Sequence, residues 1–89
     1  MQERKVDIIN KLGLHARAAT KLASTANKFS SKVTVSYAGK DIDAKSIMAL
    51  MLLAAAKGST ITIKTEGADE TAALEEIVAL INNRFDEEV

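Results

Sequence analysis

The ten residues VTVSYAGKDI, from Val33 to Ile42, alternate apolar and polar side chains and carry a turn signal in their second half. Apolar side chains stand at every second position as far as Tyr37, which is the spacing of a strand with one buried face. Ala38-Gly39 then allows a tight turn into a second, shorter strand. The stretch therefore predicts an antiparallel hairpin with one buried and one solvated face.

The residues on either side of this hairpin show two kinds of spacing, the alternation of strands and the three-to-four-residue spacing of helices. Alternation predicts one more strand around Val6 and Ile8 and another around Ile61 and Ile63. Helical spacing predicts three helices. The first runs from Ala16 to about Asn27. The second is the short helix Ile47–Leu53, which follows Ser46 and stops near Lys57-Gly58, where Gly favours a left-handed C-terminus. The third runs from Glu70 to about Arg84, with Asp69 as its N-cap.

The predicted order of elements is β-α-β-β-α-β-α. Strands that alternate apolar and polar residues are typical of an antiparallel sheet covered on one side. We therefore expect an α+β fold, an open-faced β-sandwich in which a four-stranded antiparallel sheet carries three helices on one side. The chain has no repeat and no linker-like stretch, so we expect a single domain over residues 1–89.

Composition excludes several classes of function. The 89 residues include one His and no Cys, which excludes disulfide scaffolds, zinc-cysteine sites and multi-histidine metal sites, and we expect no metal and no cofactor. Lys and Arg number 12, as do Asp and Glu, and this balance argues against nucleic-acid or anionic-membrane binding. The longest apolar run, Ile47 to Ala56, has half of the ~20 residues that span a bilayer. We expect a cytoplasmic protein without membrane insertion.

The neutral total conceals two oppositely charged halves. Residues 1–45 carry a formal charge of +5 and residues 46–89 a charge of −5. We expect the basic half to form a positive rim around His15 that includes Arg17, Lys21 and Lys45. We expect the acidic residues to form a solubilising face made of Glu66, Asp69, Glu70, Glu75, Glu76, Asp86, Glu87 and Glu88.

The most informative segment runs from Asn10 to Ala19 and contains the single histidine. Gly13 permits a turn, and His15 then immediately precedes the first helix. A helix start offers unpaired backbone N–H groups, here those of Ala16 and Arg17, which suit an anion. The same field disfavours a charged imidazolium, and the Arg17 guanidinium suits phosphoryl oxygens. These features predict a histidine that accepts and hands on a phosphoryl group, although a surface histidine that happens to cap a helix remains an alternative.

Gly13-Leu14-His15-Ala16-Arg17, followed by Ala18-Ala19-Thr20, resembles the active-site motif of the HPr phosphocarrier family of the bacterial phosphoenolpyruvate-dependent sugar phosphotransferase system. The resemblance covers essentially the whole chain. It extends through Lys45-Ser46-Ile47-Met48, Ala56-Lys57-Gly58 and Gly67-Ala68-Asp69-Glu70.

The resemblance implies a monomeric carrier with a transient phosphohistidine, not an enzyme. His15 would accept a phosphoryl group on Nδ1 from phosphorylated enzyme I, itself charged by phosphoenolpyruvate, and pass it to an EIIA protein or domain. Arg17 and the first backbone N–H groups of the helix would stabilise the phosphoryl group. The family normally has Pro where this chain has Ala18, and we expect a less rigid site that still works.

Ser46 has two compatible interpretations. Serine is a preferred N-cap, so its hydroxyl is expected to accept a hydrogen bond at the start of the short helix. By resemblance, Lys45-Ser46-Ile47-Met48 matches the site that the bifunctional HPr kinase/phosphorylase modifies in many relatives. A phosphate there would add about two negative charges beside a docking surface.

The short helix after Ser46 is apolar on every side, and a small core cannot bury all of it. We expect Leu50 and Leu53 to pack inward. Ile47, Met48 and Met51 are then expected to form an exposed patch for partners, and by resemblance this region of HPr binds enzyme I, EIIA and the kinase.

Three functions are alternatives to the sugar-uptake carrier. One is a regulatory paralogue that acts through protein binding by the Ser46 helix. Another is a carrier of the nitrogen-related branch, because the chain also resembles NPr in Ile47–Leu53 and Ala79–Glu87. The third is a nucleic-acid-binding domain. It is disfavoured because Tyr37 is the single aromatic residue of the expected strands and there is no basic surplus.

Overall fold

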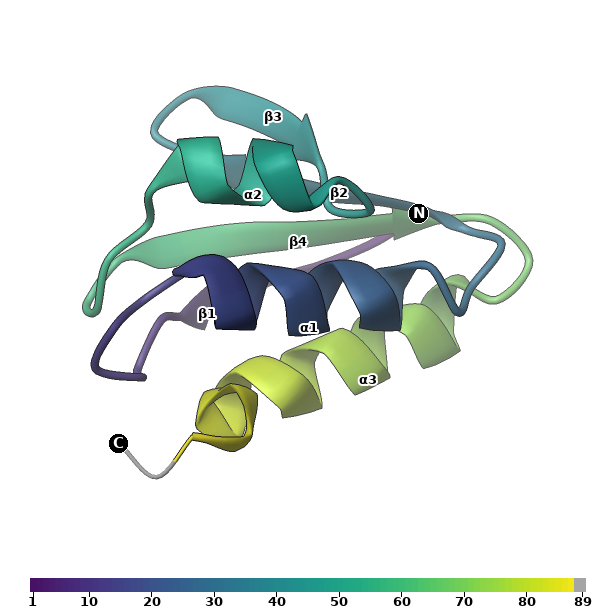
Figure 1. The fold of residues 1–89 in the computed structure, drawn as a ribbon. Helices are drawn as coiled ribbons and strands as arrows, with labels where there is room; N and C mark the ends of the chain where they lie inside the picture. The colour runs from purple at the N-terminus through teal and green to yellow at the C-terminus, as the bar shows by residue number, and fades with distance from the viewer. Residues whose placement is uncertain (88–89) are drawn as a thin grey trace.

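Four strands form one antiparallel sheet in the computed structural model, which describes residues 1–87 (Figure 1). The strands are β1 (Gln2–Asp7), β2 (Lys32–Tyr37), β3 (Lys40–Asp43) and β4 (Thr60–Glu66). Their spatial order is β1-β4-β2-β3, so the last strand of the chain lies between the first two. The expected hairpin forms, with Tyr37 paired to Lys40 and positive φ angles at Ala38 and Gly39.

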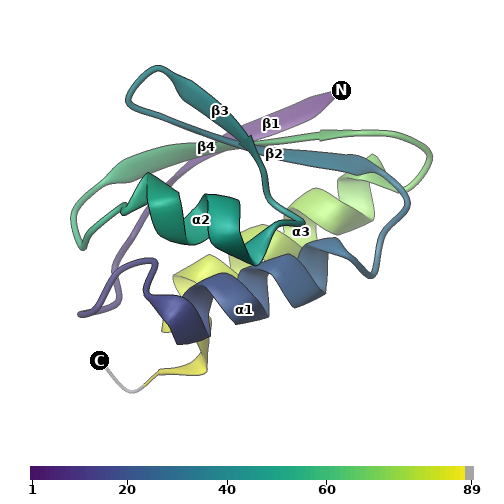
Figure 2. The same cartoon turned by 45° about the horizontal axis from the view of Figure 1, so that its top comes forward.

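Within residues 1–87, three helices cover one face of this sheet and none covers the opposite face (Figure 2). They are α1 (Ala16–Ala26), α2 (Ile47–Leu53) and α3 (Glu70–Asn82). Helices α1 and α3 lie side by side beneath the strands, and α2 packs against α1 and β3. The predicted α+β open-faced sandwich and its order of elements are confirmed. No helix within residues 1–87 has the length and apolar character needed to cross a membrane.

The hydrophobic core fills the space between the sheet and the helices. The strands contribute their inward positions, such as Val35 and Ile63, and the helices contribute one stripe each, such as Leu22 and Ile77. Each such side chain stabilises the fold by roughly 1.5–3 kcal/mol relative to remaining exposed. Phe85, beyond the end of α3, is also fully buried.

Two helix ends differ from the predicted ones. Helix α2 ends at a left-handed Ala54 (φ 54°), several residues before Gly58, because the chain must turn at once to bring Ala55 against the loop that precedes His15. Helix α3 ends at Asn82, and Arg84 to Asp86 form a short 3₁₀ turn, η1. The chain leaves the helical path there because this turn directs the Phe85 ring into the core.

Asp69 lies at the N-cap position of α3 but does not cap that helix with its side chain. Its carboxylate accepts hydrogen bonds from the backbone N–H groups of Ser30 (3.0 Å) and Ser31 (2.9 Å) and from the Ser31 hydroxyl. The Ser31 hydroxyl is the largest cause that lowers the pKa of Asp69 from 3.8 to about 2, followed by the Ser30 N–H. Asp69 therefore fastens two loops together, and its expected place in a solubilising face is wrong.

Candidate functional site

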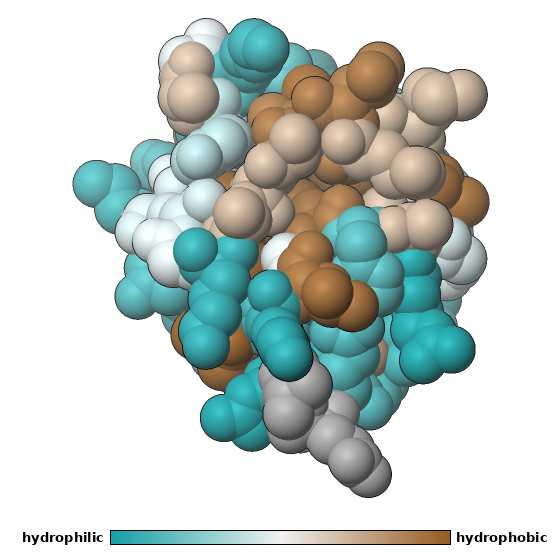
Figure 3. Space-filling view, turned by 60° about the vertical axis from the view of Figure 1, so that its left-hand side comes forward, coloured by the Kyte–Doolittle hydropathy of each residue, from teal (hydrophilic) through white to brown (hydrophobic). Residues whose placement is uncertain are grey.

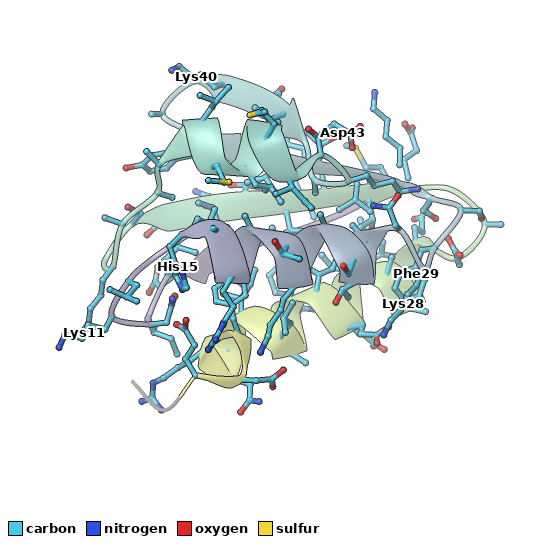
Figure 4. The ribbon with its side chains drawn as sticks, in the orientation of Figure 1. Lys11, His15, Lys28, Phe29, Lys40 and Asp43 are labelled. Carbon is cyan, nitrogen blue, oxygen red and sulfur yellow. The ribbon has the colours of Figure 1, made fainter. Side chains whose placement is uncertain are left out.

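His15 occupies the N-cap position of α1, with an extended backbone (φ −78°, ψ −179°). Its carbonyl accepts the first helical hydrogen bond, from the N–H of Ala19 at 2.8 Å. The N–H groups of Ala16, Arg17 and Ala18 precede that bond, so the helix offers them to an anion, together with its positive end. Figure 4 shows His15 at the open end of the helix, on the same side of the molecule as Lys11.

The loop before His15 is held by a close backbone approach. The N–H of Leu14 donates to the carbonyl of Ala55 at 2.9 Å, just after α2. Gly13 has a φ of +64°, and a Cβ atom there would lie 2.6 Å from the same carbonyl oxygen. Only glycine fits this position, because any other side chain would meet both the left-handed backbone and the Ala55 carbonyl.

A carboxylate from the C-terminal segment contacts the histidine ring. Oε2 of Glu87 lies 2.5 Å from Nε2 of His15, and Oε1 of Glu87 accepts from Nδ2 of Asn10 at 2.9 Å. The Glu87 side chain is only 12% exposed. Its expected place in a solubilising face is therefore wrong, and that of Glu88 lies outside the described residues. Sequence reasoning missed this contact because 72 residues separate the two partners.

The contacts of Glu87 stabilise its ionised form. The hydrogen bond from the Asn10 amide is the largest cause that lowers the pKa of Glu87 below its ordinary value. The hydrogen bond and charge of His15 and the charge of Arg17 act in the same direction, against the loss of hydration. A carboxylate that stays ionised can only accept hydrogen bonds.

The expected positive rim around His15 forms only in part. Arg17 is exposed on the first turn of α1. Lys21 folds over the C-terminal segment, where Nζ donates to the Phe85 carbonyl at 2.9 Å and lies 3.6 Å from Asp86.

Lys45 does not belong to this rim. Its ammonium donates to the carbonyl of Phe29 at 2.8 Å, and Figure 4 shows Phe29 at the opposite end of α1 from His15. Asn27, the C-cap of α1, donates to the carbonyl of Lys45 at 3.1 Å, so the next residue, Ser46, also lies near that end. The predicted N-cap at Ser46 is confirmed, since Oγ accepts from the N–H of Ala49 at 3.2 Å.

An exposed apolar surface adjoins the histidine. Leu50 and Leu53 are buried as expected, whereas Ile47, Met48 and Met51 are exposed. Leu52 (75% exposed) and Leu12 (65% exposed) were not predicted. Five of the exposed apolar residues make up the apolar patch: Leu12, Ile47, Met48, Met51 and Leu52.

The apolar patch reaches the histidine through a shared hollow. Leu12, Met51 and His15 line it together, so the patch continues up to the imidazole ring. Figure 3 shows hydrophobic side chains gathered on this end of the molecule, bordered by hydrophilic ones. Within residues 1–87, no group of three or more acidic or histidine side chains is arranged to hold a metal ion.

Comparison with known proteins gives a consistent result. The model of the PTS-HPr family, described as the PTS HPr component phosphorylation site, matches residues 2–83. The phosphocarrier protein HPr of Cupriavidus necator is 54% identical over 98% of both chains, and the phosphocarrier protein NPr of Shewanella violacea is 48% identical over 96% of this chain and 93% of its own. The crystal structure of HPr-C-His from Thermoanaerobacter tengcongensis superposes with a TM-score of 0.96 at 43% identity, covering all of both chains.

Proposed function

The chain belongs to the HPr family of phosphocarrier proteins of the phosphotransferase system, and from this premise we propose that His15 is the residue that carries the phosphoryl group. The observation that carries the proposal is the position of His15 at the open N-terminus of α1, beside three backbone N–H groups that precede the first helical hydrogen bond. These groups and the exposed Arg17 provide what a transferred phosphoryl group needs, which is hydrogen-bond donors and positive charge.

The proposed transfer uses the ring nitrogen that Glu87 leaves free. The lone pair of His15 Nδ1 forms a bond to phosphorus while the phosphorus–nitrogen bond of the donor breaks and its electron pair returns to the donor. Phosphorylated enzyme I is the proposed donor in this first transfer. In a second transfer, an EIIA protein or domain is proposed to accept the phosphoryl group from His15. The chain would act as a monomer in the cytoplasm and would return unchanged after each transfer, as a carrier and not an enzyme.

The apolar patch is the proposed docking surface for these partners. It is continuous with the hollow at His15, so a protein that covers it also covers the phosphoryl site. Two of its members are methionines, whose flexible side chains adapt to partners of different shape. The enzyme I and EIIA surfaces that dock here would therefore be largely apolar at their centres.

Ser46 is the proposed regulatory site, as a substrate of an HPr kinase/phosphorylase where that kinase is present. Its hydroxyl lies next in sequence to Ile47 and Met48, at the distal end of the apolar patch. A phosphate there would not touch His15, because it lies at the opposite end of α1. Regulation would act on docking, by placing about two negative charges at an apolar interface.

The similarity to NPr supports one alternative, a carrier for the nitrogen-related branch. The chemistry at His15 would be the same in both branches. The identity of the EIIA protein that accepts the phosphoryl group distinguishes them.

Mixing the protein with enzyme I and labelled phosphoenolpyruvate tests the central proposal. We expect an acid-labile label on the wild-type chain and none on His15→Ala, because the phosphoramidate forms on the ring. Ser46→Ala serves as the matched control and should label like wild type. Acid-stable label on Ser46 alone would contradict the proposal.

Arg17→Glu should slow phosphoryl transfer strongly, on the order of a hundredfold, because it replaces a stabilising charge by a repelling one. The melting temperature should change little, since the side chain is exposed and contributes little packing. Stopped or quenched-flow labelling measures the rate, and thermal unfolding checks the fold. A large fall in melting temperature would show instead that Arg17 is structural.

Negative charge at the start of α2 should weaken docking without altering the chemistry at His15. Met48→Asp and Ser46→Asp are both expected to raise the KM of the protein as a substrate of enzyme I roughly tenfold, with kcat nearly unchanged. Lys40→Gln, at an exposed position of β3, changes the net charge by the same one unit and provides a control for charge alone. An equal effect of all three changes would rule out the apolar patch as the specific docking surface.

A further inference from the structure

The C-terminal segment, residues 83–87, folds back across the start of α1 and is held there. Arg84, Phe85 and Asp86 all have positive φ angles (55°, 53° and 65°), a backbone conformation that is unfavourable for residues other than glycine. Two contacts offset this cost: the Phe85 ring is fully buried, and the Phe85 carbonyl accepts from Lys21. The segment is therefore anchored immediately before Glu87.

The two oxygens of the Glu87 carboxylate have separate partners. One contacts Nε2 of His15, and the other accepts from the amide of Asn10, which is fully buried. That same amide nitrogen also donates to the carbonyl of Gly13 at 2.9 Å. Both hydrogens of Asn10 Nδ2 are thus committed to acceptors, while Oδ1 has no hydrogen-bond partner within residues 1–87. Asn10 consequently holds the carboxylate in one orientation.

We propose that Glu87 is a positioning residue for phosphoryl transfer, which fixes the proton of the neutral His15 ring on Nε2 and so leaves the lone pair on Nδ1. This inference rests on the proposed function of His15. An ionised carboxylate 2.5 Å from Nε2 can only accept a hydrogen bond, so the ring must donate from Nε2. A neutral imidazole carries a single proton, and its other nitrogen is then the acceptor.

The same contact also stabilises the product of the transfer. When Nδ1 forms its bond to phosphorus, the donor's bond breaks with its electron pair, and the ring keeps the proton on Nε2. The ring then carries a positive charge, which the Glu87 carboxylate faces directly. Handing the phosphoryl group on returns the electron pair to Nδ1 and restores the neutral ring. A carboxylate that orients and stabilises a histidine in this way is a recurrent arrangement in proteins.

Glu87→Ala tests the inference against the matched control Asp86→Ala. Asp86 is also a carboxylate of the same segment, but it is 58% exposed and pairs with Lys21, not with His15. With enzyme I and phosphoenolpyruvate, we expect Glu87→Ala to accept the phosphoryl group about tenfold more slowly than wild type, and Asp86→Ala to accept it at nearly the wild-type rate. Both variants keep the Phe85 anchor, and thermal unfolding checks that they remain folded.

The protonation state of the ring gives a readout that a merely structural role would not move. In ¹⁵N-labelled, unphosphorylated protein, at a pH at which the His15 ring is neutral, we expect NMR spectra to show a hydrogen-bonded proton on Nε2 and an unprotonated Nδ1. Glu87→Ala should lose this proton signal and populate the form protonated on Nδ1, whereas Asp86→Ala should not.

Failure of this inference can be told apart from failure of the proposed function. A wild-type chain that takes no label on His15 overturns the proposed function, whatever the ring spectra show. A wild-type chain that is labelled, with Glu87→Ala equal to it in rate and in ring protonation, overturns only the role of Glu87. A faster transfer in Glu87→Ala also overturns that role, because it would mean that the C-terminal segment shields His15.

Discussion

The contact between the backbone of the loop before His15 and the backbone just after α2 is the constraint on which the rest of the site depends. Leu14 donates to the Ala55 carbonyl, and Gly13 approaches that carbonyl more closely than any residue with a Cβ atom permits. The contact requires α2 to end abruptly, which the left-handed Ala54 achieves. It thereby sets the start of α1, with its unpaired N–H groups, beside the apolar patch, so that a partner docked on the patch would also cover the start of α1.

The charged side chains around His15 do not follow the division of the sequence into a basic half and an acidic half. The basic half does not gather around His15, because Lys45 is bound at the far end of α1 and Lys21 is engaged by the C-terminal segment. The acidic half does not stay apart, because Glu87 returns to the histidine. The site therefore combines one exposed guanidinium, one helix N-terminus and one carboxylate. Such a combination can bind an anionic group and also balance the positive charge of a phosphorylated ring.

The fold and the position of His15 were predictable because their signals are local. Alternation in Val33–Tyr37 and the helical stripes specify elements, and His15 follows Gly13 directly before a helix. Lys45, Glu87 and Asp69 were misplaced because their partners lie 16 to 72 residues away, where spacing carries no information. One signal was present: Phe85 continues the apolar stripe of α3, and its burial requires the chain to turn inward just before Glu87.

Locating phosphorus and proton on the His15 ring tests the account most directly. The ¹⁵N-labelled protein would be phosphorylated with enzyme I and phosphoenolpyruvate, and the couplings of the ring nitrogens to ³¹P and ¹H would be measured by NMR. The account predicts phosphorus bonded to Nδ1 and a proton retained on Nε2, opposite Glu87. Phosphorus on Nε2 would contradict it, because that nitrogen could react only if the Glu87 carboxylate first left the place it occupies in this structure.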